Sequence, residues 1–146
     1  MKRFALFIMA FLCACSLNAL DKSGKIEVLV TNLRNSNGKI GINLFSGKKG
    51  FPAKHEAALK KVFSDIKDNS CTVIFEDVPY GAYAVSVFHD ENVNLKLDTT
   101  IIGMPKEGVG ASNNAKGRFG PPKYKDASFL LDSNEKTIHI VVEYLK

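Results

Sequence analysis

The sequence has no tryptophan and only three cysteines, and the positions of the cysteines limit the chemistry that they can carry. Cys13 and Cys15 lie in the apolar leader described below, so removal of that leader leaves Cys71 alone. A single cysteine forms neither an internal disulfide nor a Cys-x-x-Cys redox pair. Cys71 begins a stretch of alternating apolar residues, which predicts a buried structural thiol rather than a reactive one.

An excess of charge of one sign is also lacking. The chain has 20 Lys and Arg against 15 Asp and Glu, and removal of Lys2 and Arg3 lowers the net charge from +5 to +3. The basic residues are scattered, without a stripe of arginines and interleaved aromatic residues. This distribution argues against a nucleic-acid-binding surface.

The continuous apolar run at residues 4–12 is much shorter than the roughly 20 residues that a membrane-spanning helix needs. It follows Lys2-Arg3 and precedes small residues that end at Ala19, which is the pattern of a signal peptide, residues 1–19. We therefore expect export, most simply to a periplasm, and no transmembrane helix after cleavage. Residues 12–15 also resemble a lipobox, so lipid attachment at Cys15 is the alternative.

Residues 20–146 have the length and the apolar content of one globular domain. Residues 26–30 and 40–44 alternate apolar and polar positions, and the Asn37-Gly38 step between them predicts a β-hairpin. A second hairpin-like pair is predicted at 71–75 and 83–87, around Pro79 and Gly81, and further strands at 127–131 and 138–144. The predicted fold is an all-β sandwich, transthyretin-like or Ig-like, with about seven strands.

One short helix is predicted at residues 52–66, where the spacing of apolar residues changes from two to helical. Leu59, Val62, Phe63 and Ile66 would share one face, and Pro52 suits a first helical turn. His55 on this helix and His139 on the last strand are expected to face solvent.

Residues 90–126 show no sustained period and are rich in Gly, Pro and Asn. Unstructured connections of this length are usually functional or disordered. Apolar residues recur through the segment, so we expect a long ordered loop that packs on itself through Ile101, Ile102, Met104, Val109, Phe119 and Tyr124.

The first part of this loop carries oxygen-bearing side chains at the spacing of a calcium loop. Asp90, Asn92, Asn94 and Asp98 occupy positions one, three, five and nine, where carboxylates and amides wrap a cation. Position six, which favours Gly, is Leu95, and position twelve is Ile101 rather than a bidentate Glu. Glu107 would replace that carboxylate only if the loop folded back. The alternative is an Asx-rich turn in which these side chains bond their own backbone.

His89 precedes the loop and, with a nearby carboxylate, suggests acid–base chemistry as an alternative. No recognised nucleophile, phosphate-loop or zinc-protease motif occurs in the sequence, so we assign no catalytic residue. The segment as a whole is the candidate ligand or partner surface, with four polar residues singled out in it: His89, Glu107, Ser112 and Asn113.

Four stretches resemble the bacterial domain of unknown function 2141 family: residues 75–92, residues 103–108, residues 112–115 and Phe119-Gly120-Pro121-Pro122. The resemblance covers the chain from about Ile26 to Tyr144. It implies an exported bacterial protein and carries no assigned reaction. The family pattern usually has Gly where this chain has Leu95.

Together these observations predict a periplasmic binding or interaction module, with residues 89–126 as the surface for a ligand, a cation such as Ca²⁺ or an envelope partner. Two alternatives stay open. The first is a small hydrolase or isomerase that uses His89, and the second is a purely structural envelope protein.

Overall fold

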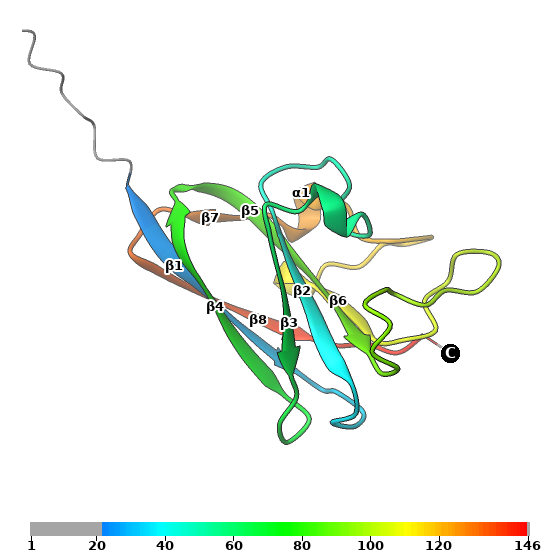
Figure 1. Cartoon of the computed structure of the whole chain (residues 1–146). Helices are drawn as coiled ribbons and strands as arrows, with labels where there is room; N and C mark the ends of the chain where they lie inside the picture. Colours follow the sequence, from blue (N-terminus) through cyan, green and yellow to red (C-terminus); the bar gives the residue numbers. More distant parts are fainter. Residues whose placement is uncertain (1–21, 146) are drawn as a thin grey trace, which may run out of the picture.

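The computed structural model describes residues 22–145, so the predicted signal peptide, its cleavage site and Cys15 lie outside the described residues. Figure 1 shows the course of the chain. The strands, in chain order, are β1 (Ser23–Thr31), β2 (Lys39–Phe45), β3 (Lys60–Asp65), β4 (Cys71–Pro79), β5 (Gly81–Asp90), β6 (Val109–Ala111), β7 (Phe129–Leu131) and β8 (Glu135–Val141). The helical pieces are η1 (His55–Ala57), η2 (Ser112–Asn114) and α1 (Tyr124–Ala127).

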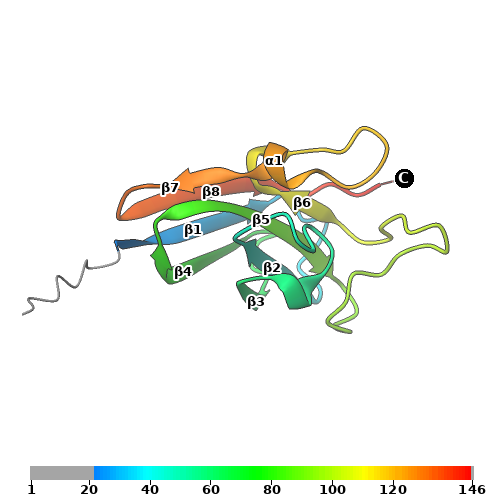
Figure 2. The same cartoon turned by 90° about the horizontal axis from the view of Figure 1, so that it is seen from above.

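The strands form two sheets that pack face to face. One sheet has the order β4-β1-β8, and the other has the order β3-β2-β5-β6, with β7 also paired to β5. Figure 2, turned by 90°, shows the two layers. Pairing is antiparallel throughout these sheets except between β1 and β8. The predicted all-β sandwich is therefore confirmed.

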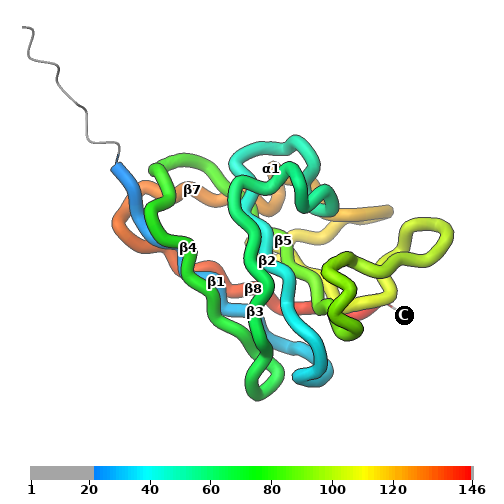
Figure 3. Tube along the Cα trace, viewed as in Figure 1, coloured from blue at the N-terminus to red at the C-terminus, as the bar shows by residue number. Residues whose placement is uncertain are grey.

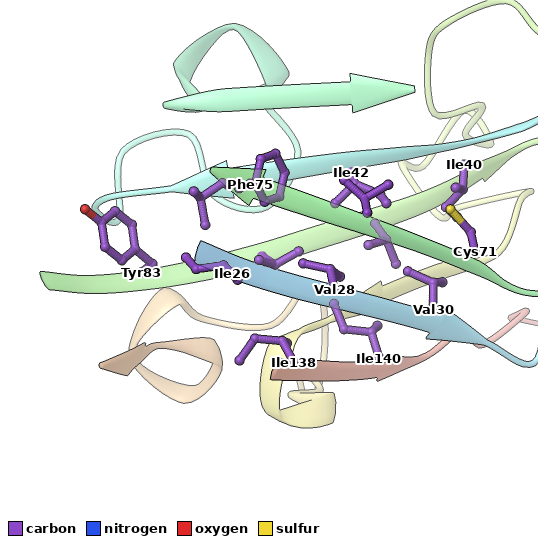
Figure 4. Packing of buried hydrophobic residues seen from close by; sticks show 14 of the residues in the cluster. Ile26, Val28, Val30, Ile40, Ile42, Cys71, Phe75, Tyr83, Ile138 and Ile140 are labelled. Atoms are coloured by element: carbon purple, nitrogen blue, oxygen red, sulfur yellow. The ribbon is translucent and has the colours of Figure 1, made fainter. Parts of the chain in front are cut away.

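The core between the sheets is built from the alternating apolar residues of the strands. Ile26, Val28 and Val30 point inward from β1, and Ile40 and Ile42 from β2; all are fully buried (Figure 4). Burying one such side chain stabilises the fold by about 1.5–3 kcal/mol. Cys71, the one cysteine among residues 22–145, is buried beside them, as predicted, and burial raises the pKa of its thiol.

The predicted hairpin between residues 26–30 and 40–44 is wrong, although both strands exist. β1 and β2 lie in different sheets, and residues 32–38 cross from one to the other. Leu33 is buried in the core on the way. Alternation identified the buried face of each strand correctly. Two strands with one buried face each, however, can pair within one sheet or face each other from opposite sheets.

The second predicted hairpin is also a crossing. β4 pairs with β1, whereas β5 pairs with β2, so the chain turns a corner between sheets at Tyr80. The Tyr83 hydroxyl donates to the Pro79 carbonyl at 2.7 Å and fixes this corner. A tyrosine bonded back to the preceding backbone is a known feature of sandwich corners.

The predicted helix at residues 52–66 is wrong: the segment contains η1 and the edge strand β3. Val62 packs against the core, whereas Phe63 lies on the other face, edge-on to Phe88 at 5.9 Å between ring centroids. Apolar residues on both faces of one strand imitate the spacing of a helix. The short helix of the protein is α1 instead, at the start of the predicted strand 127–131.

The two histidines that were expected to face solvent differ in their burial. His139 is exposed and bonds to Thr31, whereas His55 is half-buried, with its ring stacked on Phe88 at 4.8 Å. Asn43 donates to Nδ1 of His55 at 3.0 Å, and burial lowers the pKa of His55.

Figure 3 follows residues 90–126 as a long excursion from the end of β5. The segment is more regular than predicted, because it includes β6, η2 and the start of α1. Within residues 22–145, no helix is long and apolar enough to cross a membrane.

Candidate functional site

His89, near the end of β5, lies in the interior rather than in a cleft. Its ring is fully buried. Nε2 donates to the Asn37 carbonyl at 2.7 Å, and Nδ1 accepts from the Tyr144 hydroxyl at 2.7 Å. With both nitrogens bonded, the ring has no free position for a substrate or a metal. The acid–base role considered for His89 needs a ring that faces a cleft, and this geometry does not provide one.

A cluster that was not predicted from the sequence holds Glu91, the second residue of the 90–98 loop, in place. Arg34 forms a two-pronged ion pair with Glu91, and Asn35 donates to the same carboxylate at 2.9 Å. The Arg34 guanidinium also lies over the Tyr144 ring, 4.7 Å from its centroid. The hydrogen bond from Arg34 holds the pKa of Glu91 below its usual value, although partial burial opposes the shift.

We expect this ion pair to make stability depend on pH in the acidic range. A carboxyl with a lowered folded pKa contributes stability above its unfolded pKa, and loses it as the pH falls through the folded pKa. Glu91→Gln should therefore cost about 1 kcal/mol near neutral pH, and the difference from wild type should shrink as pH falls from about 6 to 3. Urea unfolding across this range measures the effect. Asp65→Asn, which breaks an exposed pair with Lys39, is the control and should change the profile much less. An equal cost at all pH values would contradict the prediction.

The 90–98 loop turns its polar oxygens toward its own backbone N–H groups. The fully buried carboxylate of Asp90 accepts from the Asn94 and Leu95 amides, at 3.1 and 2.8 Å. Asn92 Oδ1 accepts from the Asn94 amide, and Asn94 Oδ1 accepts from the Lys96 amide. Asn92 and Asn94 thus each form an Asx turn, and Asp90 bonds the backbone four and five residues further on.

Asp98 meets the ends of the two asparagine side chains. Asn92 Nδ2 donates to one of its carboxylate oxygens at 2.7 Å, and Asn94 Nδ2 donates to the other at 2.9 Å. Three of the four predicted ligand side chains therefore touch, and Asp90 joins them through the Asn94 amide. To present these oxygens to a cation beside Asp98, the amides would have to turn and give up the hydrogen bonds that Oδ1 of Asn92 and Oδ1 of Asn94 accept from the Asn94 and Lys96 amides.

Leu95 adopts the backbone conformation for which a glycine was expected. Its φ is 63°, and φ at Val93 is 58°. Left-handed backbone is costly for residues with a branched or bulky side chain. Two hydrogen bonds lie on either side of this residue and hold it there: the Leu95 amide donates to Asp90, and the Lys96 amide donates to Asn94.

Glu107 reaches the 90–98 loop, because the chain after Asp98 folds back toward it. Its carboxylate is buried, with Oε1 accepting from the Glu91 amide and Oε2 from the Asp98 amide, both at 3.0 Å. It therefore joins loop positions two and nine. Both carboxylate oxygens are committed to the backbone, so Glu107 acts as a brace rather than as a contact surface.

Ser112 and Asn113 belong to a different group of contacts. Ser112 is fully buried, where its hydroxyl accepts from the Val85 amide at 2.9 Å and donates to the Ala127 carbonyl at 2.6 Å. Asn113 is exposed and donates to the Asp126 and Ser128 carbonyls. Of the four polar residues predicted for the surface, His89, Glu107 and Ser112 are buried and support the segment from inside, and Asn113 is exposed.

The apolar side chains expected to pack the long loop are mostly exposed to solvent. Ile101, Ile102 and Phe119 are 107%, 81% and 94% exposed. They lie in two projections, residues 99–106 (the first tip) and residues 116–123 (the second tip). Both tips extend from the end of the sandwich opposite the start of β1 (Figures 1 and 2).

The chemistry available at this end is binding by oxygen ligands and by exposed apolar side chains. Within residues 22–145, no group of three or more His, Cys, Asp and Glu side chains is arranged to hold a metal ion. The 90–98 loop offers the Asp98 carboxylate and two amides, because both oxygens of the buried Asp90 accept from backbone amides. A cation in it would depend on amide and main-chain oxygens, which suits a hard cation.

The fold and this end define a small β-sandwich protein with a braced, oxygen-rich loop and two projecting tips. The chain belongs to DUF2141, a family described as uncharacterized proteins conserved in bacteria, whose model matches residues 28–139. The resemblance noted in the sequence is thereby confirmed. Neither a curated protein nor a solved structure matches the chain.

Proposed function

We propose that the protein is an exported binding module, and that the end formed by residues 89–126 is its binding surface. In this proposal a Ca²⁺ ion in the 90–98 loop organises that surface. Export rests on the signal-peptide pattern of residues 1–19. The rigid two-sheet scaffold behind the loop is the usual setting for loop-borne recognition.

The observation that carries the proposal is the placement of the loop oxygens. Asn92 and Asn94 reach the two oxygens of one carboxylate, Asp98, at 2.7 and 2.9 Å. The amide hydrogens fill the space beside this carboxylate. A cation takes that place when both amides turn and exchange their hydrogen bonds from the Asn94 and Lys96 amides for the ion. Calcium loops combine this wrapping with carboxylate, amide and main-chain oxygens from alternate positions.

The scaffold around the loop supports the same proposal. Leu95 has the left-handed backbone expected at the sharp turn of a calcium loop, and Glu107 fixes two loop positions from behind. A loop that is already shaped needs less ordering when the ion binds. The buried His89, with both ring nitrogens bonded, favours this binding function over the hydrolase or isomerase alternative.

Calcium titration of the processed protein tests the proposal. Calorimetry should give a saturable signal, and Ca²⁺ at about 100 times its Kd should stabilise the fold by about 2.7 kcal/mol, raising Tm by about 10 °C. Asp98→Asn should weaken Ca²⁺ binding at least tenfold, because it removes the carboxylate charge that both asparagine side chains reach. The N-terminal residue of the same preparation shows whether cleavage follows Ala19.

Asp132→Asn is the matched control, because Asp132 is an exposed aspartate in the turn between β7 and β8. It should bind Ca²⁺ as the unmodified protein does. Absence of heat and of a thermal shift with Ca²⁺ would refute the cation site. The structural envelope protein would then be the favoured alternative.

A further inference from the structure

We propose that the two tips dock the protein on a bilayer surface rich in anionic lipids, with their apolar apices inserted among the headgroups. This inference names the partner of the binding surface proposed above and rests on that proposal. Three features carry it: exposed apolar apices, local structure that keeps them exposed, and positive charge around them.

The apices expose large apolar side chains that the fold does not use. Ile101 and Ile102 are 107% and 81% exposed, Phe119 is 94% exposed, and Met104 is 42% exposed. Single exposed apolar residues are common on proteins, but clusters at a functional end mark interaction sites. Thr100 and Lys106 complete a shallow, open hollow beside Ile101, Ile102 and Met104.

The first tip is a small hairpin that holds its apex away from the sandwich. Thr99 pairs with Pro105, and Thr100 exchanges backbone hydrogen bonds with Met104 and Gly103. The Lys106 amide donates to the Asp98 carbonyl at 2.8 Å, which ties the hairpin to the 90–98 loop. The turn therefore displays Ile101 and Ile102 in a fixed place without burying either.

The second tip is equally tight. A Cβ atom on Gly117 would lie 1.9 Å from the Gly120 carbonyl oxygen, so the two ends of this turn touch through their backbones. Phe119 lies at the turn between them, with the Arg118 guanidinium 5.5 Å from the centre of its ring. An aromatic ring beside a basic group suits the headgroup region of a bilayer.

Positive charge surrounds both apices. Residues 96–126 contain six Lys and Arg against three Asp and Glu, a local net charge of +3. Of the acids, Glu107 is buried, Asp98 is half-buried and Asp126 is exposed. Lys116 pairs with Glu143 at 2.5 Å, which leaves five exposed basic residues around the tips: Lys96, Lys106, Arg118, Lys123 and Lys125. An anionic surface complements this arrangement.

The shape of the end favours a bilayer over a protein partner. Figure 2 shows the two tips as separate projections from one end of the molecule. A protein interface usually presents a continuous patch with a packed apolar centre and a polar rim. Separate apolar points flanked by basic residues instead match the way peripheral proteins combine shallow insertion with attraction to anionic lipids.

Vesicle binding by the processed protein tests the inference. Sedimentation with vesicles of phosphatidylglycerol and phosphatidylcholine, and with vesicles of phosphatidylcholine alone, should show at least tenfold tighter binding to the anionic set. The preference should weaken in high salt. The double variant Ile101→Asp with Ile102→Asp, and separately Phe119→Asp, should each lower binding at least tenfold.

Leu130→Asp is the matched control, because Leu130 is 54% exposed but lies on β7. It should bind vesicles as the unmodified protein does, and circular dichroism should show all variants folded. Equal binding by tip and control variants would overturn the inference, as would tip-dependent association with a protein in the absence of vesicle binding.

Each assay is run with Ca²⁺ and with a chelator, so that the two proposals fail separately. A calcium titration signal without vesicle binding in either condition would leave the cation site and reject the membrane surface. Vesicle binding that depends on the tips but not on Ca²⁺ would leave the membrane surface and reject the organising ion. Loss of both would reject the proposed binding end itself.

Discussion

Gly38→Ala is expected to destabilise the protein by about 2–5 kcal/mol. Gly38 has φ of 73°, in the left-handed region that an alanine adopts only at a cost. In addition, a Cβ atom there would lie 2.0 Å from the Asp90 carbonyl oxygen and 2.7 Å from the Glu91 Cα. Because both of these are backbone atoms, no side-chain rotation relieves the overlap.

The measurement is urea unfolding of the variant beside Gly47→Ala. Gly47 has no atom within 4 Å of an added Cβ and no positive φ, so its replacement should be neutral or slightly stabilising. Since Asp90 begins the 90–98 loop, Gly38→Ala should also weaken the proposed Ca²⁺ binding. A loss of stability no greater than that of the Gly47 variant would contradict the close approach of the two backbones.

The sequence predicted the buried faces of the strands much better than their partners. Ile26, Val28 and Val30 were expected inside and are inside. Their alternation, however, depends only on the two sides of one strand. Whether β1 pairs with β2 or faces it across the core depends on long-range packing, and the Asn37-Gly38 turn signal is compatible with both.

The candidate site divides in the same way into local and distant parts. The arrangement of Asp90, Asn92 and Asn94 follows from their spacing, because Asx side chains bond amides two to five residues along the chain. Arg34 and Tyr144 come from segments far away in the sequence, and nothing local to the loop indicates them. Only the topology of the sandwich brings them to Glu91 and His89.

The tips were mispredicted for a different reason. Ile101, Ile102 and Phe119 were expected to anchor the loop because apolar residues are usually buried. That rule holds in one direction only, since much of the surface of any folded protein is apolar. The sequence alone therefore does not separate an apolar residue that packs inside from one that is exposed. Only a structure shows that these side chains cluster at exposed tips, and such a cluster indicates an interaction surface.

Replacing Glu107 should have the second large effect, because its carboxylate is the brace of the candidate site. Glu107→Ala would leave the Glu91 and Asp98 amides without their acceptor in a buried place. Hydrogen bonds to a charged group contribute about 1.5–3 kcal/mol each, so we expect a loss of about 2–4 kcal/mol after local relaxation. Glu107→Gln keeps one acceptor oxygen and should lose roughly half as much.

Hydrogen exchange at the Glu91 and Asp98 amides separates a loss of the brace from a general loss of stability. In Glu107→Ala the exchange rate of these two amides should rise at least tenfold more than that of the β1 core amides. The reason is that the loop opens locally before the sandwich unfolds. Glu56→Ala removes an exposed glutamate from η1 and serves as the control, with little change in either measurement. Uniformly faster exchange across loop and core would instead mean that Glu107 supports the whole fold. The loop would then not be a separately braced element, and Ca²⁺ binding and vesicle docking would be expected to fail only as the protein unfolds.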